Sequence, residues 1–173
     1  EDVPISIANF DSKTLTNANI QSLSEVEKLT AGVRFDKRTN FVVPTIRGIT
    51  TNIVLAGGGS NIGVYLDGFY SPALQGSDIQ LLNVDSVQIL KGPQGTLFGR
   101  NTNGGAIQVN TAEPNQKTRF IGEAGYGSYD AFRMQAYGNL ALDERTSLDM
   151  AVSYATGDGY TTNIANGDDK IGK

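Results

Sequence analysis

A glycine-rich stretch, KGPQGTLFGRNTNGG at residues 91–105, is the part of the sequence that most resembles a site for chemistry. Glycine-rich loops can cradle phosphate, but a P-loop has the pattern GxxxxGK[ST]. Here Gly95 and Gly99 lie one residue too close together, and Arg100-Asn101 stands where Lys-Ser or Lys-Thr is needed. A dinucleotide GxGxxG pattern opening a helix is also missing. The stretch therefore predicts a tight backbone path between two strands, in which glycine permits positive φ and close backbone approach. Its structural glycines are Gly92, Gly99, Gly104 and Gly105.

Residue types that commonly carry catalysis are scarce in the chain. It contains no His and no Cys, so these residues cannot form a Ser-His-Asp or Cys-His nucleophilic site, a thiolate or imidazole zinc site, or a disulfide. The acidic turns at residues 157–159 and 167–169 lack the terminal Glu of a twelve-residue calcium loop. Paired carboxylates remain available, but no motif places them. We predict no catalytic residue, no metal ligand and no cofactor, and a function other than enzymatic.

Composition and charge narrow the class of protein further. The chain has 173 residues with 21 glycines, a net charge of −4 and 39% hydrophobic residues. Mild acidity argues against nucleic-acid binding, which depends on clustered Lys and Arg. The N-terminus lacks the basic and apolar segments of a signal peptide, which leaves a cytoplasmic protein or an exported one with its signal removed. No cation occurs from Gly48 to Leu90, and Arg47 and Lys91 border that span.

The first 112 residues have an α+β pattern with long loops. Alternation of Val3, Ile5 and Ile7 predicts a strand. A helix is expected from a cap at Asp11 or Ser12 to about Asn19. A second helix is expected after residues 21–22, with Leu23, Val26 and Leu29 at helical spacing and Gly32 as its stop. Further strands are predicted at residues 41–46, 63–66, 84–90 and 106–110.

The pattern changes after a polar connector at residues 113–118. Three strand-like runs follow, at residues 118–126, 131–140 and 146–155, and their lengths match those of membrane-spanning β-strands. In the last two runs, residues of a mainly apolar face alternate with residues of a polar face. The first of these faces carries Phe132, Met134, Ala136, Gly138 and Leu140, then Leu148, Met150, Val152 and Tyr154. A soluble antiparallel sheet with one wet face and the beginning of an outer-membrane barrel both give this alternation.

Four motifs in order carry a resemblance to a known family. They are TIRG at residues 45–48, VYLDG at 64–68, VDSVQILKGP at 84–93 and LFGRNTNGGAIQV at 97–109. Together they resemble the N-terminal plug of TonB-dependent outer-membrane receptors. The resemblance implies an α+β plug domain over residues 1–112, a connector at 113–118, and the start of an antiparallel transmembrane β-barrel over 119–173. The complete barrel would have about 22 strands, with the remainder beyond residue 173.

The resemblance also assigns roles to individual residues. Arg47 matches the plug arginine that pairs with glutamates of the barrel wall, and Gly48 and Gly68 are structural glycines of the motifs. Lys91 stands where arginine is common and keeps the charge without bidentate pairing. Solute contacts would come from apex loops at residues 36–41, 51–60 and 69–76. Four loop side chains able to hydrogen-bond or stack are the candidate solute ligands: Arg38, Asn52, Tyr70 and Gln75.

The function implied is TonB-dependent active import of a scarce solute across the outer membrane of a Gram-negative bacterium, in which the plug gates the barrel and helps to bind the solute. The expected partners are a TonB-type inner-membrane energy-coupling protein, outer-membrane lipid, and a ferric siderophore, cobalamin, haem, carbohydrate or aromatic compound. The TonB-binding segment is expected upstream of residue 1. The alternative is a soluble periplasmic binding or scaffold module, which requires a polar outer face on the strands of residues 118–155.

Overall fold

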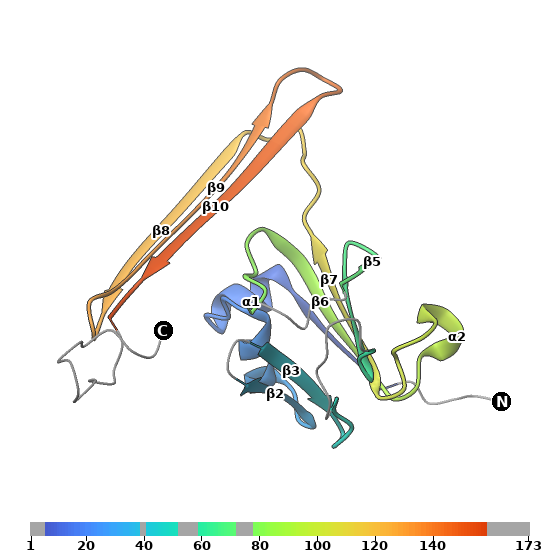
Figure 1. Ribbon diagram of the computed structural model, residues 1–173. Helices are drawn as coiled ribbons and strands as arrows, with labels where there is room; N and C mark the ends of the chain where they lie inside the picture. Colours follow the sequence, from blue (N-terminus) through green and yellow to red (C-terminus); the bar gives the residue numbers. More distant parts are fainter. Residues whose placement is uncertain (1–5, 39–40, 52–58, 72–77, 159–173) are drawn as a thin grey trace. The chain divides into compact units, whose positions relative to one another are not determined.

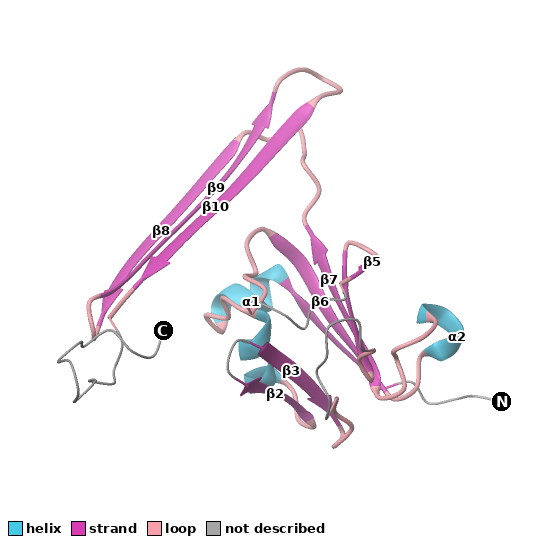
Figure 2. Cartoon of the chain, viewed as in Figure 1, coloured by secondary structure: helices cyan, strands magenta, loops and turns pink. Residues whose placement is uncertain are grey.

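The chain divides into two compact units, Glu1–Ala112 (unit 1) and Glu113–Lys173 (unit 2), each considered by itself. The computed structural model describes residues 6–38, 41–51, 59–71 and 78–158 (Figure 1). Within these residues, no helix has the length and apolar character needed to cross a membrane. Unit 1 combines helices with sheet, whereas the described elements of unit 2 are all strands (Figure 2).

A five-stranded mixed sheet forms the centre of unit 1. Its order is β1 (Ser6–Asp11), β6 (Val84–Lys91), β7 (Gly105–Thr111), β4 (Ile62–Leu66) and β5 (Phe69–Tyr70). Neighbouring strands are antiparallel except β4 and β7, which run parallel. The α+β prediction is confirmed, and β4, β6 and β7 extend the predicted runs by one or two residues. Val3 and Ile5 of the predicted first strand lie outside the described residues.

Two short helical segments follow β1. The helix α1 (Ser12–Asn17) begins at Asp11, whose Oδ1 accepts a hydrogen bond of 2.8 Å from the Thr14 N–H. Of the two caps predicted from the sequence, Asp11 and Ser12, the structure thus has Asp11. The second segment, η1 (Leu23–Leu29), is a 3-10 helix. Its three apolar residues, Leu23, Val26 and Leu29, are spaced by three, so the three-residue period of a 3-10 helix places them on one face.

The apolar core of unit 1 lies on one face of the central sheet. α1, η1 and the hairpin of β2 (Val33–Arg38) and β3 (Phe41–Ile46) supply side chains to it. The fully buried members include Val26 of η1, Ile46 of β3, Ile89 of β6, and Ile107 and Val109 of β7. Alternate residues of β6 and β7 point into this core because successive side chains of a strand face opposite ways.

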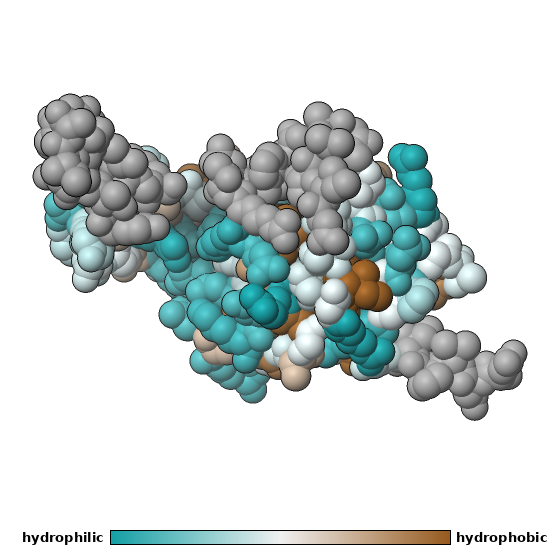
Figure 3. Space-filling view, turned by 60° about the horizontal axis from the view of Figure 1, so that its bottom comes forward, coloured by the Kyte–Doolittle hydropathy of each residue, from teal (hydrophilic) through white to brown (hydrophobic). Residues whose placement is uncertain are grey.

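The opposite face of the central sheet is mostly polar. One row crosses all five strands in register: Asn9, Gln88, Gln108, Tyr65 and Tyr70. Beside it, Gln108 donates to Asn110, and Asn110 donates to Ser86. Seen from the side drawn in Figure 3, the coloured surface of the molecule is largely hydrophilic, with hydrophobic residues showing in small areas. The larger apolar cluster thus lies on one face of the sheet, and the other face carries only the smaller buried cluster of Tyr65, Leu90 and Ala106.

Glu25 of η1 makes the stability of unit 1 depend on pH. Partial burial raises its pKa, but hydrogen bonds from Lys28 (2.9 Å) and from the Gln21 N–H (2.8 Å) outweigh burial and leave the pKa below its ordinary value. A carboxyl whose pKa is lower in the folded state contributes stability that is present above its unfolded pKa and is lost as pH falls through its folded pKa.

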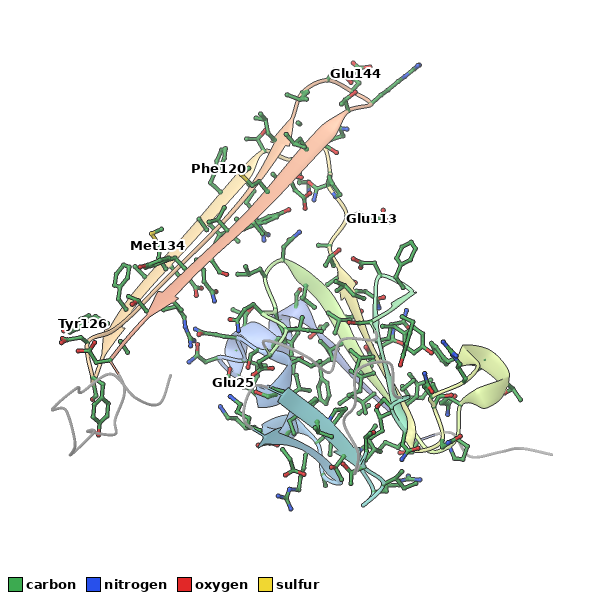
Figure 4. The ribbon with its side chains drawn as sticks, in the orientation of Figure 1. Glu25, Glu113, Phe120, Tyr126, Met134 and Glu144 are labelled. Carbon is green, nitrogen blue, oxygen red and sulfur yellow. The ribbon has the colours of Figure 1, made fainter. Side chains whose placement is uncertain are left out.

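We therefore expect the stability difference between the wild-type protein and Glu25→Gln to be greatest near neutral pH. It should begin to shrink as pH falls below about 4.5, the ordinary pKa of a glutamate, and be lost as pH falls through the lowered folded pKa, below which both side chains are uncharged. Denaturant unfolding of the two proteins across this range measures the difference. A difference that stays constant with pH would show that the Glu25 charge does not stabilise η1. In Figure 4, Glu25 is labelled on unit 1.

Unit 2 contains a meander of three long antiparallel strands. β8 (Arg119–Gly127), β9 (Ala131–Ala141) and β10 (Ser147–Thr156) lie side by side in the order β10-β9-β8 (Figure 1). Their bounds agree with the predicted runs within one residue. The register pairs Leu140 with Leu148 and Ala136 with both Val152 and Gly122. Because the pairing is in register, Phe120 and Tyr126 of β8 share one face with the alternating apolar residues of β9 and β10, whereas Ile121 pairs with Tyr137 on the other face.

That apolar face is exposed. Phe120 and Met134 project from one side of the sheet (Figure 4), and Phe120, Met150 and Val152 are 74%, 69% and 47% exposed. A Cβ built at Gly138 would lie 2.9 Å from the Phe120 ring, so that ring covers the glycine across the strand pair. The register assigns the following residues to the other face: Arg119, Glu123, Arg133, Gln135, Asn139 and Asp149.

Candidate functional site

The motifs Arg47-Gly48 and Asp67-Gly68 form two-residue turns with matching backbone angles. The φ values are 50° and 81° in the first turn and 49° and 81° in the second. Positive φ at both central residues is characteristic of a type I′ turn, and Gly is favoured at its second position. The turns join β3 to the segment that begins at Ile49, and β4 to β5. Each turn thus fixes the position of one charged residue at the end of a strand, Arg47 in the first turn and Asp67 in the second.

Arg47 and Lys91, the two predicted plug–barrel contacts, differ in their surroundings. Arg47 is exposed, and no carboxylate among the described residues pairs with it. Lys91 is partly buried, and its Nζ donates to Thr30 Oγ1 at 2.7 Å and to the Ala31 carbonyl at 2.8 Å. The Arg47 guanidinium is therefore open to a further partner, whereas Lys91 would first have to lose two hydrogen bonds. The wall contact stays a prediction for both residues, and this geometry favours Arg47.

Asp67 links the β4–β5 turn to the end of β7. Its carboxylate accepts from the Thr111 N–H at 2.7 Å and from the Thr111 hydroxyl at 2.9 Å, and its own N–H donates to the Val109 carbonyl at 2.9 Å. On the β6 side, Asn83 exchanges hydrogen bonds of 2.8 and 3.2 Å with Ala112. The last residues of unit 1 are thus held from two neighbouring strands.

We expect Asp67→Ala to destabilise the end of β7 by about 1–2 kcal/mol, because it removes the acceptor of two hydrogen bonds. Hydrogen exchange at the Thr111 amide should speed up correspondingly. The matched control is Asp85→Ala, since Asp85 is also exposed but no hydrogen bond of its side chain is found within the described part of the chain. Equal exchange rates at Thr111 in both variants would contradict a specific role for Asp67.

The predicted apex stretches need two corrections. In the stretch at residues 36–41, Asp36 to Arg38 belong to strand β2 and Phe41 to strand β3, with Arg38 paired to Phe41. The strand forms here because β2 pairs with β3 in register from Val33↔Ile46 to Arg38↔Phe41. Likewise, the stretch at residues 69–76 opens with strand β5. Asn52 and Gln75 lie outside the described residues. As solute ligands, Arg38, Asn52, Tyr70 and Gln75 stay predictions.

Hydrogen bonds close the base of the second predicted stretch, Thr51 to Ser60. The hydroxyls of Thr51 and Ser60 lie 3.1 Å apart, and both residues are buried. The Asn61 N–H donates to Thr51 Oγ1 at 2.9 Å, and its side-chain amide donates to the Thr50 carbonyl at 2.9 Å. The two ends of the stretch therefore meet in a hydrogen-bonded stem.

Asp78 similarly anchors the chain just after the third predicted stretch. It accepts from the Ser24 N–H at 2.8 Å and from the Ser24 hydroxyl, and Lys37 Nζ of β2 lies 3.8 Å from its Oδ2. Sequence reasoning did not assign Asp78 a role. The signal available was its place as one of the acids in the cation-free span from Gly48 to Leu90.

Tyr70 lies in a small aromatic and amide cluster on the polar face of the central sheet. Its ring centroid is 5.6 Å from that of Tyr65, which lies 4.9 Å from that of Phe98. Tyr65 donates to the Phe98 carbonyl at 2.8 Å, and Asn101 donates to the Tyr70 hydroxyl at 3.0 Å. Burial, and then the nearby Tyr70, raise the pKa of Tyr65, so its hydroxyl stays protonated at neutral pH.

The glycine-rich stretch at residues 91–105 contains more structure than predicted. Residues Gly95–Phe98 form the one-turn helix α2, at one end of the central sheet in Figure 1. Thr102, which is 1% exposed, donates to the Gly99 carbonyl at 2.8 Å, and its carbonyl accepts from the Gln94 N–H at 3.0 Å. Among the described residues, no cluster of acidic side chains suited to a metal ion occurs.

Comparison with known proteins assigns this architecture to a class. The family described as TonB-dependent Receptor Plug Domain matches residues 1–106, which is more than half of the chain. The pesticin receptor of Yersinia pestis is 29% identical over 164 residues, which cover 91% of this chain and 24% of that relative. The vitamin B12 transporter BtuB of Vibrio vulnificus is 24% identical over 169 residues, covering 88% of this chain and 27% of the relative.

Solved structures show the same fold. The ferric yersiniabactin uptake receptor FyuA of Yersinia pestis superimposes with a TM-score of 0.83 at 24% identity, covering 97% of this chain and 27% of FyuA. The pyoverdine outer membrane receptor FpvA of Pseudomonas aeruginosa gives a TM-score of 0.74 at 21% identity, covering 92% of this chain and 23% of FpvA. The fold is thus a plug followed by the antiparallel strands that open a plugged barrel.

The chain belongs to the TonB-dependent receptor plug family. Members of this family are receptors of the Gram-negative outer membrane, which confirms the resemblance and the location predicted from the sequence motifs. The relatives are named as receptors and transporters. The chain spans about a quarter of the length of the pesticin receptor and of BtuB.

Proposed function

We propose that the protein carries out TonB-dependent active import of a scarce solute across the outer membrane, with the plug gating the barrel and contributing to solute binding. The observation that carries this proposal is the continuous exposed apolar face of β8–β10 directly following a plug fold. A β-barrel in lipid requires outward apolar residues that alternate with inward polar ones. Binding and conformational gating form no covalent bond, so the protein acts as a transporter without enzymatic activity.

A ferric siderophore is the solute that the relatives support best. FyuA takes up ferric yersiniabactin, and FpvA is a pyoverdine receptor. Cobalamin is a second candidate solute, because the relative BtuB is a vitamin B12 transporter. The coupling partner is a TonB-type inner-membrane protein. Arg38, Asn52, Tyr70 and Gln75 are our candidate solute ligands, and Arg47 and Lys91 our candidate contacts with the barrel wall.

The alternative of a soluble periplasmic module has less support. It requires the exposed outer face of the unit 2 strands to be polar. Phe120, Met150 and Val152 instead expose apolar side chains on one face. Such a face in a water-soluble sheet would promote aggregation.

Uptake by cells producing the complete protein tests the proposal. The host is a Gram-negative strain deprived of its own siderophore receptors, and the probes are radioactive-iron complexes of yersiniabactin, pyoverdine, alcaligin and a catecholate, together with labelled cobalamin. We expect one probe to accumulate well above the receptor-free strain, and the protein to fractionate with outer membranes and to need detergent for extraction. Extraction without detergent, or no accumulation of any probe, would contradict it.

A further inference from the structure

Asn101 connects two of the predicted solute stretches through its side chain. Its Nδ2 donates to the Tyr70 hydroxyl at 3.0 Å, and Tyr70 opens the stretch at residues 69–76. On its other side, Asn101 lies against Gly59 in the stretch at residues 51–60, because a Cβ built at Gly59 would lie 2.5 Å from Asn101 Oδ1. Asn101 itself has a φ of 69°, a conformation that asparagine tolerates better than most residues.

The direction of the Asn101–Tyr70 hydrogen bond determines what Tyr70 can do. A phenol oxygen accepts hydrogen bonds and also carries one O–H donor. The amide of Asn101 donates to the oxygen, so the Tyr70 O–H keeps its proton for another acceptor. Within the described residues, Tyr70 donates to none. The Tyr70 ring is held by Tyr65, and Tyr65 in turn is held by its bond to the Phe98 carbonyl.

We propose that Asn101 is a positioning residue for solute binding, which orients Tyr70 so that its hydroxyl donates to an oxygen acceptor of the solute. Carboxylate, phenolate and hydroxamate oxygens, the iron ligands of siderophores, are acceptors of this kind. This inference rests on the proposed function, since it concerns the same solute. It adds a residue that touches no solute and acts by fixing the direction of one hydrogen bond.

The variant that tests the direction of the bond is Asn101→Asp. An aspartate has the same size but only accepts, so the Tyr70 O–H would donate its hydrogen bond to residue 101 and the two residues would stay linked. Using the complete receptor in detergent and whichever ferric siderophore of the panel the wild-type protein binds, we expect about a tenfold loss of affinity in Asn101→Asp and in Tyr70→Phe. The double variant should be no weaker than either single variant. Asn103→Asp, an exposed change of the same charge in the same segment, is the control and should bind as wild type.

Hydrogen exchange separates positioning from a structural role. The amides to follow are those of Asn61, Ile62 and Ser71, which are bonded at the bases of the two stretches. Asn101→Ala removes the link and should raise exchange at these amides, and Gly59→Ala should do so by displacing the Asn101 side chain. Asn101→Asp should leave exchange unchanged although affinity falls.

Each outcome decides the inference. Wild-type affinity in Asn101→Asp would overturn it, and so would an equal loss in Asn103→Asp, because the effect would then be one of charge alone. Exchange raised equally in Asn101→Asp and Asn101→Ala would reduce Asn101 to a structural residue. In all of these results the wild-type protein still binds and accumulates the probe, so the proposed function stands. Failure of the wild-type protein to bind any probe would overturn the proposed function and, with it, this inference.

Discussion

Replacing Val152 with arginine is expected to lower the stability of the membrane-assembled protein by about 2–4 kcal/mol, the cost of a cation on the lipid face of a barrel strand near mid-membrane. Val152 lies in the middle of β10 on the exposed apolar face, paired with Ala136 of β9. The effect follows directly from the proposed assignment of this face to lipid. Denaturant unfolding of the complete protein in lipid vesicles measures the change.

The control for this experiment is the neighbouring residue. Ser153→Arg introduces the same side chain one position along β10, on the polar face. Its cost should be within about 1 kcal/mol, because a lumen-facing arginine stays hydrated. If both substitutions cost the same, the two faces of β8–β10 are not in different environments, and the assignment of the apolar face to lipid fails.

Gly105→Ala is expected to destabilise unit 1 by about 3 kcal/mol or more. Gly105 opens β7 at a φ of 147°, where a side chain is strained, and a Cβ there would collide with the Leu90 carbonyl oxygen and lie 3.0 Å from Ile46 Cδ1. Backbone strain and overpacking each cost about 1–3 kcal/mol. Hydrogen exchange of the β6 and β7 amides in the complete protein reports the loss, since these strands are paired through Gly105 and Lys91.

Gly95→Ala is the matched substitution in the same glycine-rich stretch. Gly95 has no positive φ, and no atom lies within 4 Å of the position of its Cβ. Its effect on the same amides should be neutral or slightly stabilising, because alanine restricts the unfolded chain. A similar loss in both variants would mean that the stretch tolerates no side chain anywhere, and that the close contact at Gly105 is not the cause.

Several elements of the fold could be predicted because local pattern and final environment agree. The last two runs of unit 2 alternate in the sequence because one of their faces is apolar, and the structure pairs them in register. The helix cap at Asp11 or Ser12 could be predicted because a cap depends only on residues close in the sequence, here Asp11 and Thr14. Four motifs with their spacing were sufficient to identify the family.

Other features depend on contacts between residues far apart in the chain, and no local pattern reports these. The resemblance implies a loop from residue 36 to residue 41, whereas Asp36, Lys37 and Arg38 pair with β3 through contacts that no local pattern predicts. The link from Asn101 to Tyr70 spans thirty-one positions, and that from Lys91 to Thr30 spans sixty-one. For Asn101 the available signal was an asparagine in a glycine-rich segment, which is compatible with positive φ.

Accumulation of the solute in paired strains with and without the TonB-type partner tests the central claim most directly. Both strains produce the complete protein, and the probe is the iron complex that wild-type cells take up. The account predicts equal binding of the probe at the surface of both strains and accumulation inside only the strain that has the partner. Equal accumulation in the two strains would contradict it, because the plug would then admit the solute without energy coupling.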